Sequence, residues 1–318
     1  MSKSVTILTG FLGSGKTTFL NALLIAKKDK KFAIIENEFG QEGIDGELVM
    51  KPDDSLFEMN NGCLCCTLND NIYEILSELN SRNQEYDELL IETTGIADPA
   101  GVANPFFGNS EIKRDFSVKR VVCLIDVALI LDQLKNTEEA IKQIVFADVL
   151  LLNKTASVTE AHLNEIKETL EKLNPFAKVF KENDGQFPID KIYATERDQD
   201  FKTGGKDTSH DHKSGHHHHG DIASLSFVFD KPFNEKELQM RLFGYLVFEA
   251  KDLYRVKGII HAKDIEHRLI LQSVGQSLVI TGGRKWDEGE EKKSRIVFIG
   301  KHLDKSLFEQ MLNGSLAE

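Results

Sequence analysis

Proline, cysteine and tryptophan are scarce in this sequence: of 318 residues, 6 are proline, 4 are cysteine and 1 is tryptophan. Hydrophobic residues make up 41% and charged residues 28%, which excludes a collagen-like or wholly disordered chain. Three of the cysteines, Cys63, Cys65 and Cys66, lie within four positions. That spacing is too tight for the disulfide framework of a secreted domain, and it favours a metal in a reducing compartment.

Long apolar runs are also missing. No stretch of 18 apolar residues occurs, so we expect no membrane-spanning helix. The N-terminus reads MSKSVTILTGFLGSGK; its short apolar run ends in glycines without a cleavage pattern, so we expect no signal peptide and a cytoplasmic location. An excess of basic residues is lacking too, because 39 Lys and Arg face 51 Asp and Glu for a net charge of −12. This sign excludes nucleic-acid coating as the main role.

Short apolar runs alternate with helical stretches in the first half of the chain. This alternation predicts repeated βαβ units and an α/β domain with a mostly parallel sheet, whose ligands bind beyond the carboxyl ends of the strands. The predicted strands are residues 5–8, 32–35, 89–91, 121–125 and 149–152, and two of the predicted helices are residues 17–28 and 159–173.

Residues 196–221 hold one large apolar residue, Phe201, and no periodic pattern, so they are predicted to be a His-rich linker. The linker separates a P-loop domain at residues 1–195 from a smaller α+β domain with an antiparallel sheet at residues 222–318. The second domain is predicted to hold strands 225–229, 259–262, 268–273, 277–281 and 296–299 and helices 235–248 and 305–312.

The segment GFLGSGKT at residues 10–17 satisfies the G-x4-G-K-[ST] pattern, between a predicted strand and a predicted helix. Its glycines let backbone N–H groups surround phosphate oxygens, Lys16 reaches the outer phosphates, and the Thr17 hydroxyl can ligate Mg²⁺. The predicted nucleotide-binding residues here are Gly13, Ser14, Gly15, Lys16, Thr17 and Thr18. We assign the catalytic role to Lys16 and to Glu92, an acid at the end of the strand in LLIETTG that is expected to hold Mg²⁺ directly or through water. A solvated glutamate is the competing interpretation of Glu92.

A base-binding element follows the strand at 149–152. Asn153 and Lys154 match the start of the N-K-x-D element that reads guanine, but Ala156 replaces the aspartate that accepts hydrogen bonds from the base. Each such charge-assisted bond contributes roughly 1.5 to 3 kcal/mol. GTP is therefore the expected nucleotide and ATP stays open, unless Glu160 or a backbone carbonyl compensates.

The motif Cys63-Leu64-Cys65-Cys66 offers three soft ligands for Zn²⁺, too few for a closed tetrahedral site. An open site that receives and releases metal fits better than a zinc finger, and a group of buried small hydrophobes is the alternative. Glu36, in IENEFG, lies where a nucleotide-sensing switch would follow the second strand, and a solvated acidic loop is the equal alternative. Cys123 is expected in the core, and Asp126 is a weaker nucleotide-site candidate.

Histidines cluster in the linker, where they can chelate transition metals without selecting among them. A solvated linker with incidental affinity, or a tag, would look the same. The cluster comprises His210, His212, His216, His217, His218 and His219.

Five motifs follow one another in order: GFLGSGKTT, IENEFG, NGCLCC, LLIETTGIADP and FADVLLLNKT. With them the chain resembles the CobW-like family of P-loop GTPases of the metal-chaperone type, and RVKG at 255–258 and RIVFIG at 295–300 extend the resemblance to the family's C-terminal domain. The resemblance implies GTP binding coupled to the handling of zinc, or less readily cobalt, and its delivery to a client metalloprotein. It makes Cys65 and Cys66, with Cys63 and Glu36, the internal metal site. Two departures are Ala156 and Gln41, which stands where several relatives carry an acid.

The main hypothesis is a GTP-hydrolysing metallochaperone that uses GTP, Mg²⁺ and Zn²⁺, in which GTP orders residues 36–40 and brings carboxylate and thiolates together. Its partners are a transition-metal ion and a client metalloprotein, with no nucleic acid and no membrane, and a homo-oligomer is left open. The rivals are a metal buffer that stores ions on the histidines without nucleotide coupling, and a phosphotransferase, for which no acceptor pocket is apparent.

Overall fold

The computed structural model describes residues 2–36, 56–59, 71–197, 222–248 and 252–317. The chain divides into two compact units, Met1–Arg197 and Asp198–Glu318. Each unit has its own sheet and its own core, so each is described separately.

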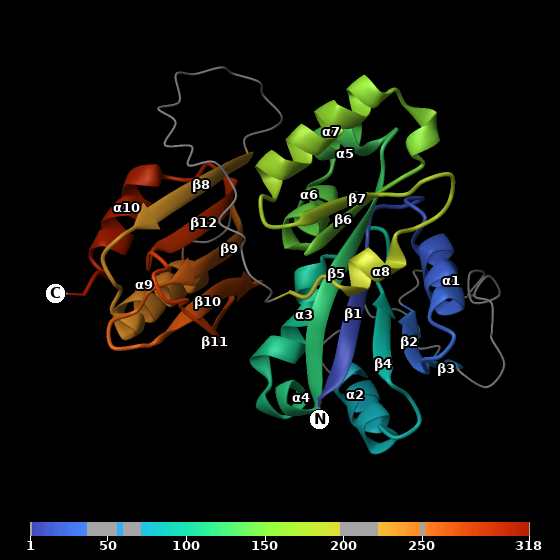
Figure 1. Ribbon diagram of the computed structural model, residues 1–318, viewed down its shortest axis with the longest axis horizontal. Coiled ribbons are helices and arrows are strands. Elements are labelled where there is room, and N and C mark those ends of the chain that lie inside the picture. Colours follow the sequence, from blue (N-terminus) through green and yellow to red (C-terminus); the bar gives the residue numbers. More distant parts are fainter. Residues whose placement is uncertain (1, 37–55, 60–70, 198–221, 249–251, 318) are drawn as a thin grey trace. The chain divides into compact units, whose positions relative to one another are not determined.

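The first unit is built on a seven-stranded sheet in the order β3-β2-β4-β1-β5-β6-β7, in which every recorded strand pair is parallel (Figure 1). Parallel neighbours require crossover connections, and described helices lie between β1 and β2, between β3 and β4, and between each later pair of consecutive strands up to β7. The strands are β1 Lys3–Thr9, β2 Phe32–Glu36, β3 Leu56–Met59, β4 Glu88–Glu92, β5 Phe116–Asp126, β6 Val149–Asn153 and β7 Lys178–Lys181. This confirms the predicted parallel α/β fold of the P-loop domain.

Helices cover the sheet, and α1 and α8 pack on one of its faces. Phe19, Leu20 and Leu23 of α1 join Ile192 of α8 in a core cluster with buried residues of five strands. The helices of this unit are α1 Lys16–Ala26, α2 Asn71–Ser81, α3 Pro99–Gly108, α4 Ser110–Asp115, α5 Ile130–Asn136, α6 Glu138–Phe146, α7 Glu160–Leu173 and α8 Ile189–Tyr193. Because all strands are parallel, their carboxyl ends meet at one sheet edge, where ligands bind in such folds.

Two strands of the first sheet do not appear in the sequence as short apolar runs and were not predicted. The segments of β3, LFEM, and of β7, KVFK, contain charged residues and are only four residues long. They are the two outermost strands of the described sheet, so they need less apolar surface than the central strands. The predicted central strands are confirmed, and β5 is longer than predicted because it begins at Phe116.

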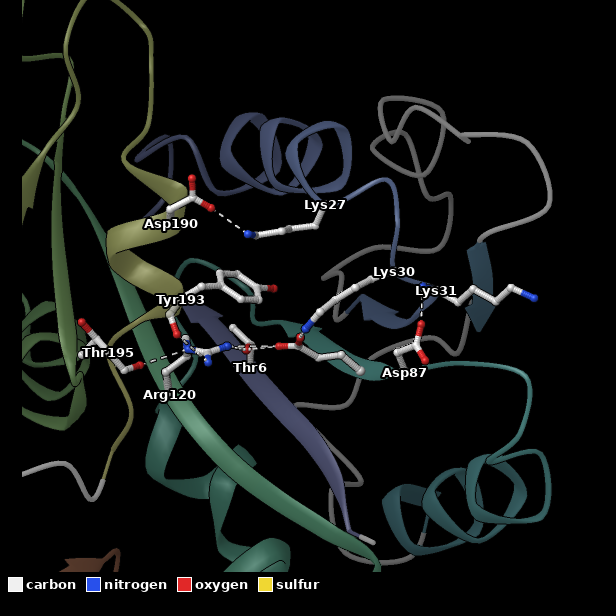
Figure 2. A network of polar contacts seen from close by, with 10 residues as sticks. Thr6, Lys27, Lys30, Lys31, Asp87, Arg120, Asp190, Tyr193 and Thr195 are labelled. Carbon is white, nitrogen blue, oxygen red and sulfur yellow. Dashed lines mark hydrogen bonds and ion pairs between the residues drawn. The ribbon is translucent and has the colours of Figure 1, made fainter.

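A buried polar network ties α8 and the residues after it to the sheet (Figure 2). The Arg120 guanidinium donates to the Glu88 carboxylate at 3.2 Å, to the Thr6 hydroxyl at 2.9 Å and to the Thr195 carbonyl at 3.2 Å. The same guanidinium lies 4.3 Å from the centre of the Tyr193 ring. The network therefore links β1, β4 and β5 to the chain that leaves the first unit.

Arg197 extends this anchoring to the last described residue of the first unit. Its N–H donates to the Lys119 carbonyl at 2.7 Å, and its buried guanidinium lies 3.4 Å from the Asp148 carboxylate. Residues up to Arg197 thus pack with the first sheet, two positions beyond the predicted end of the domain.

In its described residues, 222–248 and 252–317, the second unit holds a five-stranded antiparallel sheet in the order β11-β10-β9-β12-β8 and the helices α9 and α10 (Figure 1). Its core combines aliphatic side chains with phenylalanine rings, and the rings of Phe298 and Phe308 stack with centroids 4.0 Å apart. The elements are β8 Ile222–Phe229, α9 Glu235–Phe248, β9 Leu253–Ile260, β10 His267–Val274, β11 Ser277–Lys285, β12 Ser294–Lys301 and α10 Lys305–Asn313. The predicted α+β C-terminal fold is confirmed.

The prediction of a strand at residues 259–262 is wrong in its bounds, since β9 begins at Leu253 and ends at Ile260. The cause is the charged pair Arg255 and Lys257, which are 0% and 5% exposed although their charge indicates a surface segment.

None of the described helices is both long and apolar enough to cross a membrane.

Candidate functional site

The glycine-rich loop joins β1 to α1 at the carboxyl edge of the sheet. Gly15, with φ 96°, forms the N-cap of α1 in a left-handed conformation that favours glycine. A Cβ atom at this position would also collide with the amide nitrogen of the Asn153 side chain. The glycine is therefore required both by the turn and by the approach of β6.

Lys16 opens α1 and extends back over the loop. Its ammonium group lies 3.0 Å from the Gly10 carbonyl and 3.5 Å from the Phe11 carbonyl. Ser14 is 1% exposed, and its hydroxyl has no hydrogen-bond partner among the described residues. The loop thus places a cation and an unpartnered hydroxyl at the start of a helix, where backbone N–H groups and the helix dipole favour an anion.

Thr17 and Glu92, both predicted to serve Mg²⁺, lie side by side. The Thr17 hydroxyl donates to the Glu92 carboxylate at 3.1 Å. The contact follows from strand pairing, because Leu8 at the end of β1 is in register with Glu92 at the end of β4. Glu36 at the end of β2 is in turn in register with Glu92, so the backbone positions of the two glutamates are neighbours where β2 and β4 end.

Asn153 and Lys154 reach the glycine-rich loop from the end of β6. The Asn153 amide donates to the Ser14 carbonyl at 2.8 Å, and the Lys154 ammonium donates to the Gly13 carbonyl at 2.9 Å. Lys154 also forms an ion pair of 2.7 Å with Asp126 at the end of β5. The structure therefore brings together the predicted phosphate-side and base-side residues, and it joins Asp126 to them. Their roles in nucleotide binding stay predictions.

Ala156 lies exposed in the short 3-10 turn Thr155–Ser157, directly after these residues. Its methyl group offers no acceptor to a base. Thr18, the last predicted phosphate-binding residue, is likewise exposed, on the first turn of α1.

One buried residue at this edge is missing from the sequence-based set. Gln143 of α6 is 1% exposed, and its amide donates to the Gly95 carbonyl at 3.1 Å and to the Ala97 carbonyl at 3.2 Å. It thereby holds the loop after β4, where a Cβ on Gly95 would collide with Leu12 of the glycine-rich loop. The signal that the sequence offers for Gln143 is a polar residue among the apolar residues of the buried face of α6.

Cys123 is confirmed as a core residue. It is 2% exposed on β5, and burial raises the pKa of its thiol to about 12, although the charge of Lys16 acts in the opposite direction. A thiol with so high a pKa is not a thiolate ligand at neutral pH.

The predicted metal-binding cysteines and histidines lie outside the described residues, as does Gln41. Of Glu36, only the backbone position at the end of β2 is described. Within the described part of the chain, no group of three His, Cys, Asp or Glu side chains is arranged to hold a metal ion. The cysteines concerned are Cys63, Cys65 and Cys66, and the histidines are His210, His212, His216, His217, His218 and His219.

Comparisons with known proteins agree with this architecture. Residues 4–181 match the family described as CobW/HypB/UreG, nucleotide-binding domain, and residues 222–316 match the cobalamin synthesis protein cobW C-terminal domain. A protein named zinc chaperone CobW, from Pseudomonas aeruginosa, is 30% identical over 98% of this chain and 91% of its own length. A protein named zinc chaperone YjiA, from Escherichia coli, is 30% identical over 93% of both chains.

Among solved structures, Zn(II)-bound YjiA GTPase from E. coli matches with a TM-score of 0.71 and 27% identity, over 100% of both chains. The match thus spans both units. On these grounds the predicted resemblance is confirmed, and the chain belongs to the CobW family of P-loop proteins.

Proposed function

We propose that this protein is a GTPase that binds zinc in a nucleotide-dependent manner and passes it to a client metalloprotein. One observation carries the nucleotide part: the ends of β1, β4 and β6 bring Thr17 to Glu92 and Asn153 to the glycine-rich loop. The structural relative that covers this chain is itself named a GTPase. In this proposal residues 1–195 bind nucleotide and metal, residues 196–221 link the domains, and residues 222–318 recognise the client.

Mg²⁺ fits the residues at the end of β4. The donors there are the Thr17 hydroxyl and a Glu92 carboxylate oxygen 3.1 Å away, and oxygen ligands are the ones that Mg²⁺ prefers. When bound, Mg²⁺ supplies positive charge to the phosphate oxygens. Thr17 and Glu92 would hold it, and Lys16, whose ammonium group lies 3.0 Å from the Gly10 carbonyl, would add a second positive charge.

Three features support zinc as the cargo. Cys63, Cys65 and Cys66 supply soft thiolate ligands, which suit zinc. In the sequence, the motif begins four residues after Met59, which ends β3 at the sheet edge that also holds the ends of β2 and β4. Finally, relatives that cover most of the chain are named zinc chaperones.

Nucleotide-dependent zinc affinity is the first expected result. Zinc competition against a chromophoric chelator, in reducing buffer, is expected to show one tight site with GTP·Mg²⁺. With GDP·Mg²⁺ or without nucleotide, the same site should bind zinc at least about tenfold more weakly. A factor of this size lies within the usual range of coupling between two ligands. Coupling is reciprocal, so zinc must strengthen GTP binding by the same factor. Equal zinc affinity in every nucleotide state would refute the coupled mechanism.

Two variants separate delivery from storage. Cys65→Ser combined with Cys66→Ser is expected to retain GTP binding and to lose the tight zinc ion. Deletion of residues 210–219 is expected to remove weak ions and to leave the tight one. If the deletion removed all bound zinc and the double variant none, the protein would be a metal buffer. ATP·Mg²⁺ in the same assay tests the choice of nucleotide.

Glu92→Gln is expected to raise the Mg²⁺ concentration needed for half-maximal GTP hydrolysis by roughly tenfold or more, as for other changes near a bound metal. The amide keeps an oxygen that accepts from Thr17, so the fold is retained while the negative charge is lost. A Mg²⁺ titration of the hydrolysis rate measures the effect. Glu85→Gln, at a surface carboxylate paired with Arg82, is the matched control. An unchanged Mg²⁺ requirement in Glu92→Gln would exclude Glu92 from the site.

A further inference from the structure

Glu182 is a buried carboxylate that directly follows β7. It is 4% exposed, and its N–H donates to the Leu152 carbonyl at 3.0 Å, so it lies beside the end of β6. Burying a charged carboxylate is costly unless hydrogen bonds compensate. Its surroundings therefore indicate what the charge does.

The partners of Glu182 come from two loops. One carboxylate oxygen accepts from the Thr155 N–H and from the Thr155 hydroxyl, both at 2.9 Å. The other oxygen accepts from the Gly185 N–H at 2.7 Å. Glu182 thus fastens the loop after β6, which carries Asn153 and Lys154, to the loop after β7.

Both loops have left-handed backbone at the points that Glu182 holds. Lys154 has φ 60° immediately before Thr155, and Asp184 has φ 49° immediately before Gly185, whose φ is 78°. Non-glycine residues rarely adopt this conformation and keep it only where neighbouring contacts enforce it. Three hydrogen bonds to one carboxylate supply that enforcement, so the shape of the two loops depends on residue 182.

Two acidic residues, Glu160 four positions after Ala156 and Glu182 bonded to the neighbouring Thr155, already have partners. Ala156 itself offers only a methyl group. Glu160, which the sequence offers as a substitute for the missing aspartate, has a side chain that is 77% exposed and lies 3.4 Å from the Lys181 ammonium. Both carboxylate oxygens of Glu182 already accept hydrogen bonds, one from Thr155 and the other from Gly185.

We propose that Glu182 is a positioning residue for the purine base. It shapes the loops after β6 and β7, and, with Ala156 in place of the usual aspartate, the site binds the purine without reading the 2-amino group of guanine. The proposal rests on the proposed function, because it presumes that a purine nucleotide binds beside Asn153.

The ionisation state of Glu182 agrees with this role. Burial alone would raise the pKa of its carboxyl, but the N–H groups of Gly185 and Thr155 and the Thr155 hydroxyl lower it below its usual range. The group is therefore charged at neutral pH and acts only as an acceptor. A glutamine at 182 can present one acceptor oxygen, and its NH₂ group would face a backbone N–H.

The test compares GTP with inosine triphosphate, which lacks only the 2-amino group. For the wild type in the presence of Mg²⁺, the dissociation constants of GTP and of inosine triphosphate are expected to agree within about threefold, because no charge-assisted hydrogen bond is made to the 2-amino group. Ala156→Asp restores the acceptor and is expected to favour GTP over inosine triphosphate by about tenfold or more. A wild-type preference of that size for GTP would overturn the proposal.

Glu182→Gln tests positioning. It is expected to raise KM for GTP and for inosine triphosphate by the same factor, about tenfold, with kcat unchanged, because the proposed role of Glu182 is to position the base and not to act on the phosphates. Glu160→Gln is the matched control and is expected to change neither constant. A fall in kcat without a change in KM would indicate a merely structural role, and a loss confined to GTP would make Glu182 a direct reader of the 2-amino group; either contradicts the proposal.

The outcome also separates this inference from the proposed function. If the wild type bound neither nucleotide, the proposed function would fail. If it bound GTP with strong discrimination against inosine triphosphate, only the inference would fail. Should Glu182→Gln not fold, as a thermal unfolding scan would reveal, the ratio measured for the wild type and for Ala156→Asp still decides the reading of the 2-amino group.

Discussion

Lys16→Ala is expected to lower kcat for GTP hydrolysis by roughly 100-fold to 1,000-fold, the usual effect of removing one group that stabilises charge in the transition state. The ammonium group lies 3.0 Å from the Gly10 carbonyl, over the loop that surrounds the phosphates in this fold. Alanine keeps the helix but removes the only positive charge contributed by residues 10–17. The loss therefore falls on chemistry rather than on folding.

The matched control is Lys27→Ala, at the other end of the same helix. Lys27 forms an ion pair of 2.7 Å with Asp190, whose side chain is 93% exposed. Such surface pairs contribute about 0 to 1 kcal/mol, so this variant is expected to keep the wild-type rate. Phosphate release under single-turnover conditions, with circular dichroism of both variants, measures the difference. Wild-type hydrolysis by Lys16→Ala would show that the loop does not act as proposed.

Arg120→Ala is expected to lower the free energy of unfolding by about 3 kcal/mol, because it removes the buried cation that pairs with the Glu88 carboxylate and leaves only the more exposed Lys30 ammonium, 3.1 Å away, as its cationic partner. The side chains of Arg120 and Glu88 are 6% and 1% exposed, and Figure 2 shows the guanidinium between Thr6, Tyr193 and Thr195. Removing the arginine also frees the Tyr193 and Thr195 carbonyls, which accept from it at 3.2 Å. The variant therefore loosens α8 as well as the sheet.

Urea unfolding followed by fluorescence or circular dichroism measures this loss. Lys30→Ala is the matched control: Lys30 also pairs with Glu88, at 3.1 Å, but its side chain is 39% exposed. Its removal is expected to cost about 1 kcal/mol or less. The double variant Arg120→Met, Glu88→Gln is expected to be more stable than Arg120→Ala, since no buried charge is left unpaired. If Arg120→Ala and Lys30→Ala cost the same, the network is not the anchor that its geometry indicates.

The glycine-rich loop between β1 and α1 could be predicted from the sequence because its signal is local. Gly10, Gly15 and Lys16 lie within seven positions, and their spacing follows from how a turn and the first turn of a helix bend. The central strands were predictable for a similar reason, since strands covered on both faces read as continuous apolar runs. The strands β3 and β7 at the edges of the described sheet, and the charged β9, have no such run.

Contacts over long sequence separations were not predictable in the same way. Thr17 and Glu92 are 75 positions apart, and Asn153 and Ser14 are 139 apart, yet hydrogen bonds join each pair. The sequence indicated that each residue ends a strand or opens a helix, but not which strands are neighbours. Gln143 and Glu182 stayed hidden for the same reason, because a polar residue at a buried position is informative only when its partners are known.

By itself, the sequence determined the P-loop, the alternation of strands and helices, the acidic net charge and the family, because each of these depends on residue types at short spacing. The tertiary structure alone decided that Asp126 pairs with Lys154 and that Glu182 holds Thr155 and Gly185. Sheet order and register set these contacts, and they arise from the packing of the whole domain rather than from any one segment.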